Sequence, residues 1–218
     1  MSEIRNIASV ISGQYEVDGG WGKYSPFEVL VNIMLSQSTH WRNVDAAMAK
    51  FVLKFKGVDD VTRADIAEIE EAIRPAGFYR VRAARISKLA RSLQENHGGR
   101  LEEITGLPYA EAKKELTSLE GIGPKTADVF LMAVKGERVL PIDVHIFRIM
   151  KRLGVANNRD DYESLRAKLE KEIPPNERAR AHLALIEFGR QVCKSQKPGC
   201  EECPIREHCR EDNKQDRG

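Results

Sequence analysis

The chain has 218 residues, 41% of them hydrophobic and 31% charged, which is the composition of a globular protein and excludes an intrinsically disordered one. The 35 lysine and arginine residues nearly balance the 33 aspartate and glutamate residues, so the net charge of +2 does not by itself indicate a nucleic-acid partner. No apolar run reaches the roughly 18 residues of a transmembrane helix, and the first residues lack the pattern of a secretory signal, so we expect a cytoplasmic protein with no membrane partner.

Amphipathic helical patterns follow one another along nearly the whole chain. Ser25-Pro26, an N-cap followed by proline, is a typical start signal for the first of them. Helices are predicted over residues 27–35, 44–55, 62–75, 79–96, 108–119, 125–134, 144–153, 162–172 and 176–191. The third is expected to turn Ile66 inward together with Ile69 and Ile73, and only Arg138–Ile142 has a weak strand pattern. We therefore expect an all-α fold.

The helix predicted over residues 79–96 carries a row of cations. They are Arg80, Arg82, Arg85, Lys88 and Arg91. Such a row can contact the phosphates of a nucleic acid, and a solvated basic face explains it equally well.

A glycine-containing turn separates two of the predicted helices, in the segment Leu119-Glu-Gly-Ile-Gly-Pro-Lys-Thr-Ala127. Gly121 and Gly123 permit positive φ angles and a close approach of another molecule, and Pro124 suits the first position of the second helix. Main-chain amides at the start of that helix would point outward and could bind a phosphate. A plain connection between two helices is the alternative interpretation.

All four cysteines lie in the last 26 residues and are separated by six, two and five residues. They are Cys193, Cys200, Cys203 and Cys209. A disulfide-stabilised protein would spread its cysteines through the fold, whereas four crowded thiols after a cysteine-free body indicate one metal or cluster site in a reducing compartment. Four thiolates suit either a [4Fe–4S] cluster or a tetrahedral zinc ion.

Three motifs, in this order, resemble those of the endonuclease III family of helix-hairpin-helix DNA glycosylases. The string LEGIGPKTA is similar to that family's hairpin, which usually reads LPGVGRKTA. Asp143, eighteen residues after Lys125, stands in the segment PIDVHIFR, which resembles the segment that holds the family's catalytic aspartate. The cysteine spacing, with Pro204 after the third cysteine, is similar to the family's iron–sulfur loop. The resemblance covers about residues 25–210.

The resemblance implies a two-lobed helical DNA glycosylase fold. Residues 22–136 would form a six-helix barrel with the helix-hairpin-helix, and residues 1–21 and 137–218 a discontinuous iron–sulfur cluster domain, with the active site in the cleft between them. The four cysteines would bind a [4Fe–4S] cluster. The implied partner is double-stranded DNA with a damaged or mismatched base, and we expect a monomer located at the nucleoid.

The implied activity is that of a base-excision repair glycosylase with AP lyase activity. Lys125 matches the amine that attacks C1′ of the sugar, forms a Schiff base and permits β-elimination. Asp143 matches the carboxylate that stabilises positive charge at C1′ and accepts a proton, and it is also expected to cap the following helix. His145 is expected to form structural hydrogen bonds and not to act as a catalytic base.

A glycosylase must flip its target base out of the duplex and fill the gap. The residues expected to contact DNA are Gln37, Phe78, Gly121, Gly123 and Lys125. Gln37 and Phe78 align with the family's inserting residues, although hydrogen bonding at a helix end and core packing, respectively, are equally good explanations. Residues that could line a base pocket, or simply pack, are His40, Trp41 and Tyr79.

Several positions depart from the family pattern. Glu120 and Pro124 replace the usual proline and arginine of the hairpin, and His40-Trp41 stands where an acidic residue is usual. The default substrate is an oxidised pyrimidine such as thymine glycol, while mismatched uracil or thymine, alkylated purines and oxidised guanine stay open. The alternatives are a glycosylase without lyase activity and a non-catalytic DNA-binding damage sensor.

Overall fold

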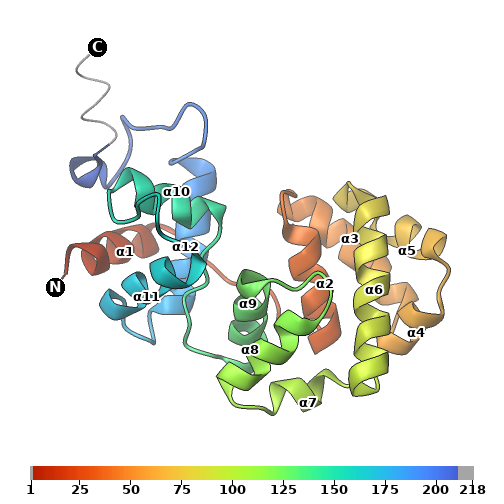
Figure 1. The fold of residues 1–218 in the computed structure, drawn as a ribbon. Coiled ribbons are helices and arrows are strands. Elements are labelled where there is room, and N and C mark those ends of the chain that lie inside the picture. The colour runs from red at the N-terminus through yellow and green to blue at the C-terminus, as the bar shows by residue number, and fades with distance from the viewer. Residues whose placement is uncertain (1, 211–218) are drawn as a thin grey trace. The chain divides into compact units, whose positions relative to one another are not determined.

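The computed structural model describes residues 2–210, and within them the chain is all-helical, as predicted. It divides into two compact units, whose helices are labelled in Figure 1. Residues 20–137 form one unit, and the segments before residue 20 and after residue 137 together form the other.

The unit of residues 20–137 contains eight α-helices and one 3₁₀ turn. They are α2 (Pro26–Ser36), α3 (Trp41–Lys54), α4 (Val58–Arg63), α5 (Ile66–Ile73), η1 (Arg74–Ala76), α6 (Tyr79–His97), α7 (Leu101–Thr105), α8 (Tyr109–Ser118) and α9 (Pro124–Lys135). The six helices predicted for this region correspond to α2, α3, α5, α6, α8 and α9. Helices α4 and α7 are additional, and at six and five residues they are too short to show a periodic pattern.

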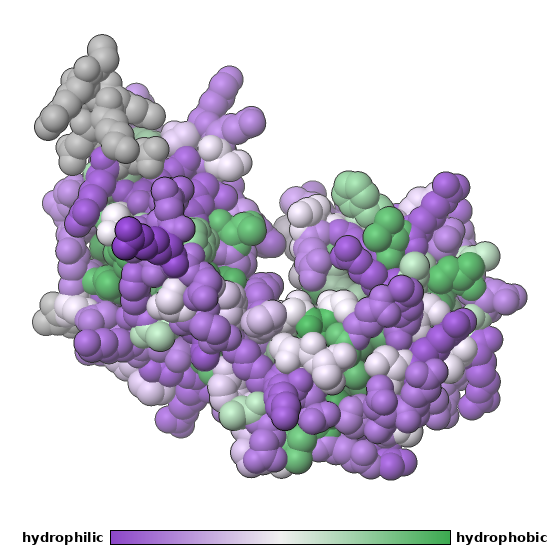
Figure 2. Space-filling view, in the orientation of Figure 1, coloured by the Kyte–Doolittle hydropathy of each residue, from purple (hydrophilic) through white to green (hydrophobic). Residues whose placement is uncertain are grey.

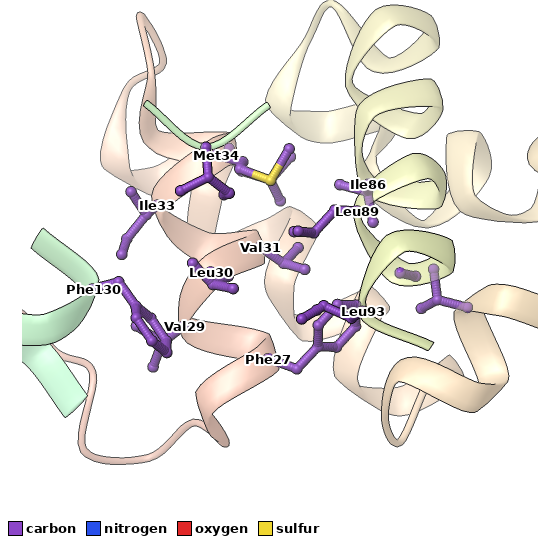
Figure 3. Packing of buried hydrophobic residues seen from close by; sticks show 14 of the residues in the cluster. Phe27, Val29, Leu30, Val31, Ile33, Met34, Ile86, Leu89, Leu93 and Phe130 are labelled. Atoms are coloured by element: carbon purple, nitrogen blue, oxygen red, sulfur yellow. The ribbon is translucent and has the colours of Figure 1, made fainter. Parts of the chain in front are cut away.

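Helix α2 is mostly buried, as expected of a helix in which apolar residues fill most positions. Its partly exposed residues are Pro26, Glu28, Asn32 and Ser36. Ser25 and Glu28 close a reciprocal capping box at its start. Figure 3 shows side chains of α6 on one side of α2 and Phe130 of α9 on the other. The buried residues of α2 are Phe27, Val29, Leu30, Val31, Ile33, Met34 and Leu35. The core of this unit is therefore built around α2.

The prediction for the third helix is wrong at its start. Thr62 belongs to the end of α4, and a new helix begins only after Asp65, whose side chain forms a capping box with Glu68. Ile66 is thus the first residue of α5 and is 44% exposed, whereas Ile69 is fully buried. An apolar residue at a helix start lies beside the capping residues and not on the packed face.

A buried ion pair joins the two helices on either side of the glycine turn. The carboxylate of Asp128, in α9, is fully buried. Its Oδ2 lies 2.9 Å from Nζ of Lys113 in α8, and its Oδ1 accepts a hydrogen bond of 2.8 Å from the hydroxyl of Tyr109. These contacts fix α8 against α9, and so they fix the ends of the turn between them.

The second unit contains four α-helices and one 3₁₀ turn within its described residues. They are α1 (Glu3–Gln14), α10 (Val144–Arg152), α11 (Tyr162–Glu172), α12 (Arg178–Gln191) and η2 (Arg206–His208). Helix α1 packs on α12 although the two are far apart in sequence. The guanidinium of Arg5 lies 2.7 Å from the Glu177 carboxylate, and Glu3 lies 3.1 Å from the ring of His208.

The strand pattern of Arg138–Ile142 does not produce a strand, which corrects that prediction. Side chains of α11 and α12 bind its backbone instead. Glu170 accepts a hydrogen bond of 2.8 Å from the Leu140 amide, Arg178 donates one of 2.7 Å to the Arg138 carbonyl, and the buried ring of His182 lies 2.8 Å from the Pro141 carbonyl. The segment is held extended without a second strand.

Hydrophilic side chains cover most of the face drawn in Figure 2, and hydrophobic ones form small separate patches. Among residues 2–210, none of the helices is both long enough and apolar enough to cross a bilayer. Large apolar residues that are exposed are Val10, Trp41, Leu53, Ile66, Phe78, Val81 and Val144.

We predict that Asp128→Ala lowers the free energy of unfolding by about 3–5 kcal/mol, because it leaves the Lys113 ammonium without its buried counter-ion. Urea unfolding followed by circular dichroism measures the change. Glu120→Gln is the matched control, since it removes the exposed Lys88–Glu120 ion pair and is expected to cost less than about 1 kcal/mol. Equal losses in the two variants would contradict a structural role for the buried pair.

Candidate functional site

The glycine turn is packed on its inner side and open on its outer side. Leu119 and Ile122 are buried, and the Ile122 amide donates a hydrogen bond of 3.2 Å to the Leu119 carbonyl. Gly121 has φ of +86°, which favours glycine, and a Cβ there would lie 3.9 Å from Cε of Met34. Gly123 is the N-cap of α9, and a Cβ added there would have no atom within 4 Å. Another molecule can therefore approach the turn closely.

Lys125 is the second residue of α9 and is half-buried. The N-cap residue of α9 is Gly123, which has no side chain to accept a hydrogen bond from the amides of the first turn. Such an N-terminus favours an anion, because the amides and the helix dipole both present positive charge. The turn brings Gly121, Gly123 and Lys125 together on one short segment.

Phe78 is 75% exposed, so the core-packing interpretation of this residue is wrong. Its φ of +48° lies in the left-handed region, which is rare for a bulky residue. Backbone strain of this kind persists only where the surroundings impose it, and it occurs preferentially at functional sites. An exposed aromatic ring on a strained backbone is well placed for contact with another molecule.

Gln37 lies at the other predicted insertion position. It is the C-cap of α2 and is exposed. Its main-chain carbonyl, and not its side-chain amide, accepts the hydrogen bonds at this helix end, from Thr39 and Arg82. Ser38 follows with φ of +54°, a second left-handed residue that is not glycine.

The three pocket candidates are held by local contacts. His40 caps α3, where its Nδ1 accepts a hydrogen bond of 3.3 Å from the Arg42 amide. Trp41 is 57% exposed, and its ring centroid lies 5.7 Å from that of His40. Tyr79 is half-buried, with the Arg74 guanidinium 4.9 Å from its ring centroid. A role in base binding stays a prediction for all three.

Arg82 differs from the other cations of α6. Arg80, Arg85, Lys88 and Arg91 are exposed, as a basic face requires. Arg82 is only 7% exposed, so the prediction that it contacts phosphate or lies on a solvated face is wrong. The 3.6-residue period of the helix indicates that Arg82 is buried, because it places Arg82 on the same face as Ile86 and Leu89.

Asp143 is the N-cap of α10, where its Oδ1 accepts a hydrogen bond of 2.9 Å from the Ile146 amide. A carboxylate can accept several hydrogen bonds, so capping leaves Asp143 able to act on a ligand. Two residues on, burial lowers the pKa of His145, with the Arg148 charge adding to the effect and Asp143 opposing it. His145 is therefore neutral near pH 7, which suits the expected structural role.

Arg148 connects α10, the helix that Asp143 caps, with the cysteine-containing loop. Its guanidinium lies 3.0 Å from Nδ1 of His145 and donates hydrogen bonds to the carbonyls of Gly189, at 2.8 Å, and Cys193, at 3.0 Å. The first cysteine is thereby fixed relative to α10 and α12.

The four cysteines line one cavity of about 240 Å³. All four cysteines are half-buried, and apolar side chains such as Ile149 and Phe188 also line the cavity. The guanidinium of Arg152 donates hydrogen bonds to Sγ of Cys193, at 3.2 Å, and to the Lys194 carbonyl, at 2.7 Å. Burial raises the pKa of Cys203, and the charges of the other three thiols add to the effect. Four thiolates here need a bound cationic group.

The lining of this cavity fits either metal group that the sequence allows. A [4Fe–4S] cluster takes four cysteine ligands, and a tetrahedral zinc ion also accepts four sulfurs. All four cysteines of the chain line the cavity, so its lining fits a group bound by four thiolates.

Residues 31–175 match the family described as HhH-GPD superfamily base excision DNA repair protein. The chain belongs to the HhH-GPD superfamily. The matched residues include the glycine turn and Asp143, and the cysteine-containing loop follows them. The resemblance inferred from the three motifs is confirmed, and this HhH-GPD protein is a DNA glycosylase of base excision repair.

Relatives of this HhH-GPD protein share most of its length. Endonuclease III of Thermotoga maritima is 34% identical over 84% of this chain and 82% of its own. A structure described as a non-covalent endonuclease III–DNA complex is 30% identical, with a TM-score of 0.85 over 99% of this chain and 98% of that chain. A trapped endonuclease III–DNA covalent intermediate gives the same identity and TM-score over 98% and 97%. The expected helical glycosylase fold is confirmed.

We predict that Gly189→Ala destabilises this HhH-GPD protein by about 1–3 kcal/mol, because the new Cβ would lie 2.7 Å from Cβ of His145 and push α10 away from α12. Gly13→Ala is the matched control. Gly13 is also helical but has nothing within 4 Å, so alanine there is expected to stabilise by up to about 1 kcal/mol. Urea unfolding of both variants measures the difference. Similar changes of the same sign would contradict the inferred crowding at His145.

Proposed function

We propose that this glycosylase is also an AP lyase, with Lys125 as its nucleophile and Asp143 as the carboxylate that assists it. The observation that carries the proposal is the position of Lys125, the second residue of α9, directly after an open glycine turn. The solved relative described as a trapped covalent intermediate supports it, because a lysine adduct is the covalent species that a lyase forms.

The proposed reaction begins with attack by the neutral Lys125 amine on C1′ of the damaged nucleotide. The bond from C1′ to the base breaks and the base leaves with its electron pair. The C1′–O4′ bond then opens as the amine nitrogen forms a double bond to C1′, O4′ takes up a proton, and the resulting Schiff base permits β-elimination of the 3′ phosphate. Asp143 stabilises positive charge at C1′ and accepts the proton that the amine loses. The helix amide held by Asp143 keeps its carboxylate oriented for this task.

Binding of the duplex is proposed to use the surfaces described above. Backbone amides at Gly121, Gly123 and Lys125 would bind a phosphate, which needs no large positive net charge. Exposed Gln37 and Phe78 would enter the base stack where the damaged nucleotide leaves it. Because these contacts need few cations, a chain with a net charge of +2 can bind DNA through them.

The four cysteines are proposed to hold a [4Fe–4S] cluster as a structural group. When bound, the cluster supplies four metal–thiolate bonds that fold the loop of residues 193–209 around it. Arg152 would stabilise the ligand charge on Cys193 through its hydrogen bond. The loop is short and mostly exposed, so it has little hydrophobic core of its own to stabilise it.

The proposed substrate is an oxidised pyrimidine in double-stranded DNA, processed by a monomer at the nucleoid. Mismatched uracil or thymine and alkylated purines are the competing substrates, because His40 and Trp41 are aromatic where the family usually has an acidic residue. Duplexes that each carry one lesion, scored separately for base release and strand cleavage, distinguish these substrates. Base release without cleavage would indicate a monofunctional glycosylase.

We predict that borohydride reduction during turnover on thymine glycol duplex traps a covalent protein–DNA adduct, and that Lys125→Ala abolishes it because the attacking amine is gone. Denaturing gel electrophoresis measures the adduct. Lys114→Ala, an exposed lysine of α8, is the matched control and is expected to trap like the wild type.

An adduct of normal yield in Lys125→Ala would refute the role of Lys125. Asp143→Asn tests the carboxylate without loss of the helix cap, since asparagine caps as well as aspartate, and is expected to slow excision by about 10²–10⁴-fold. Full activity in this variant would refute the role of Asp143, and inactivity of the wild-type protein on every lesion would favour the non-catalytic alternative.

We predict that protein purified without oxygen contains about four iron and four sulfide ions per chain, and that Cys203→Ser lowers both and reduces the thermal midpoint. Elemental analysis, sulfide assay and thermal unfolding measure these quantities. Ser195→Ala, in the same loop, is the control and is expected to keep the iron. One zinc ion per chain in place of iron would contradict the cluster.

A further inference from the structure

Arg82 places a guanidinium between two loops that are remote in sequence. Its Nη1 donates hydrogen bonds to the Leu35 carbonyl at 3.0 Å, the Ala76 carbonyl at 2.8 Å and the Thr39 hydroxyl at 2.7 Å. Its Nη2 donates a further bond to the Gln37 carbonyl. Four acceptors from two separate segments thus meet at one side chain.

These two segments are the ones that carry the proposed inserting residues. We name them the Gln37 loop, residues 37–40, and the Phe78 loop, residues 76–78. The Thr39 hydroxyl also lies 3.1 Å from the Ala76 carbonyl, so the loops contact each other directly. In addition, the Arg82 guanidinium lies 5.9 Å from the centroid of the Phe78 ring, within the range of a cation–π contact.

Burying the charged guanidinium of Arg82 is unfavourable in free energy, so we looked for a role that its contacts could serve. Within the described residues its hydrogen-bond partners are carbonyls and a hydroxyl, and none is a carboxylate. A buried charge without a counter-ion is expensive, and burial lowers the pKa of Arg82 accordingly. An apolar side chain would suit the neighbouring core residues Ala83 and Ile86 better.

Both loops also contain a residue in the left-handed region, Ser38 at φ of +54° and Phe78 at φ of +48°. Such conformations persist in residues other than glycine only where surrounding contacts impose them. The Arg82 guanidinium binds Gln37 and Thr39, on either side of Ser38, and Ala76, two residues before Phe78. Arg82 therefore supplies the contacts that hold both strained turns.

We propose that Arg82 is a positioning residue that locks the Gln37 loop to the Phe78 loop, so that the side chains of Gln37 and Phe78 enter the DNA stack as one rigid unit. The proposal rests on the insertion roles proposed above for those two side chains. Prior ordering of both loops removes an entropy loss that DNA binding would otherwise include.

The first test measures the loops without DNA or activity. Hydrogen exchange of the free protein should become faster at the amides of residues 37–40 and 76–78 in Arg82→Met, and to a smaller extent in Thr39→Val, which removes one acceptor. Arg85→Met removes an exposed cation of the same helix and should leave exchange in both loops unchanged. Unchanged exchange in Arg82→Met would overturn the proposal.

The second test measures insertion. Under single-turnover conditions on a duplex with thymine glycol, Arg82→Met should slow excision by about 10- to 100-fold and reduce the fluorescence rise of a 2-aminopurine placed beside the lesion. The dissociation constant should change much less, and Arg82→Lys should restore part of the rate. Arg85→Met should instead weaken binding in a salt-dependent manner, because its charge faces solvent.

A double-mutant cycle separates positioning from general destabilisation. If Arg82 acts through the inserting residues, Arg82→Met should add little to the defect of a Gln37→Ala, Phe78→Ala variant. Independent, multiplicative defects would overturn the proposal. If the Gln37→Ala, Phe78→Ala variant excises at the wild-type rate, the insertion roles themselves fail, and this outcome is distinguishable because hydrogen exchange would still report the contact between the loops.

Discussion

The deep burial of the apolar residues of α2 is the constraint on which the unit of residues 20–137 depends. Helices α6 and α9 pack against it from two sides, so the direction of α2 and the position of its C-terminal end are fixed. Met34, near that end, underlies Gly121 of the glycine turn, and the Leu35 carbonyl binds Arg82. The open turn and the two insertion loops are therefore supported by one mostly buried, largely apolar helix.

Long amphipathic helices could be predicted from the sequence because each carries its own pattern, and the catalytic motifs could be predicted because each is contiguous. The environment of Arg82 could not, since its four acceptors belong to α2, the loop after it and η1, and no local pattern relates them. Residue type was misleading as well, because arginine is rarely buried without a charged partner.

The segment before Asp143 gives a second example. Its residues have a strand-like sequence, yet Glu170, Arg178 and His182, which bind its backbone, lie some 30 to 40 residues further along the chain. A local pattern reports the preference for an extended backbone but not the partner that satisfies it. The cap formed by Asp143, by contrast, involves an amide three residues away, and the sequence was sufficient to predict it.

The pairing of α1 with α12 has a consequence for synthesis on the ribosome. The residues of the 20–137 unit are contiguous, so that unit can fold as soon as it emerges, whereas α1 must wait for a partner that begins more than 160 residues later. At about 5–20 residues per second, this delay is roughly 10 to 30 s. Helix α1 is thus made before the helices of the 20–137 unit but buried after them, and its apolar face, with Ile7 and Ile11, stays accessible to chaperones until α12 has been made.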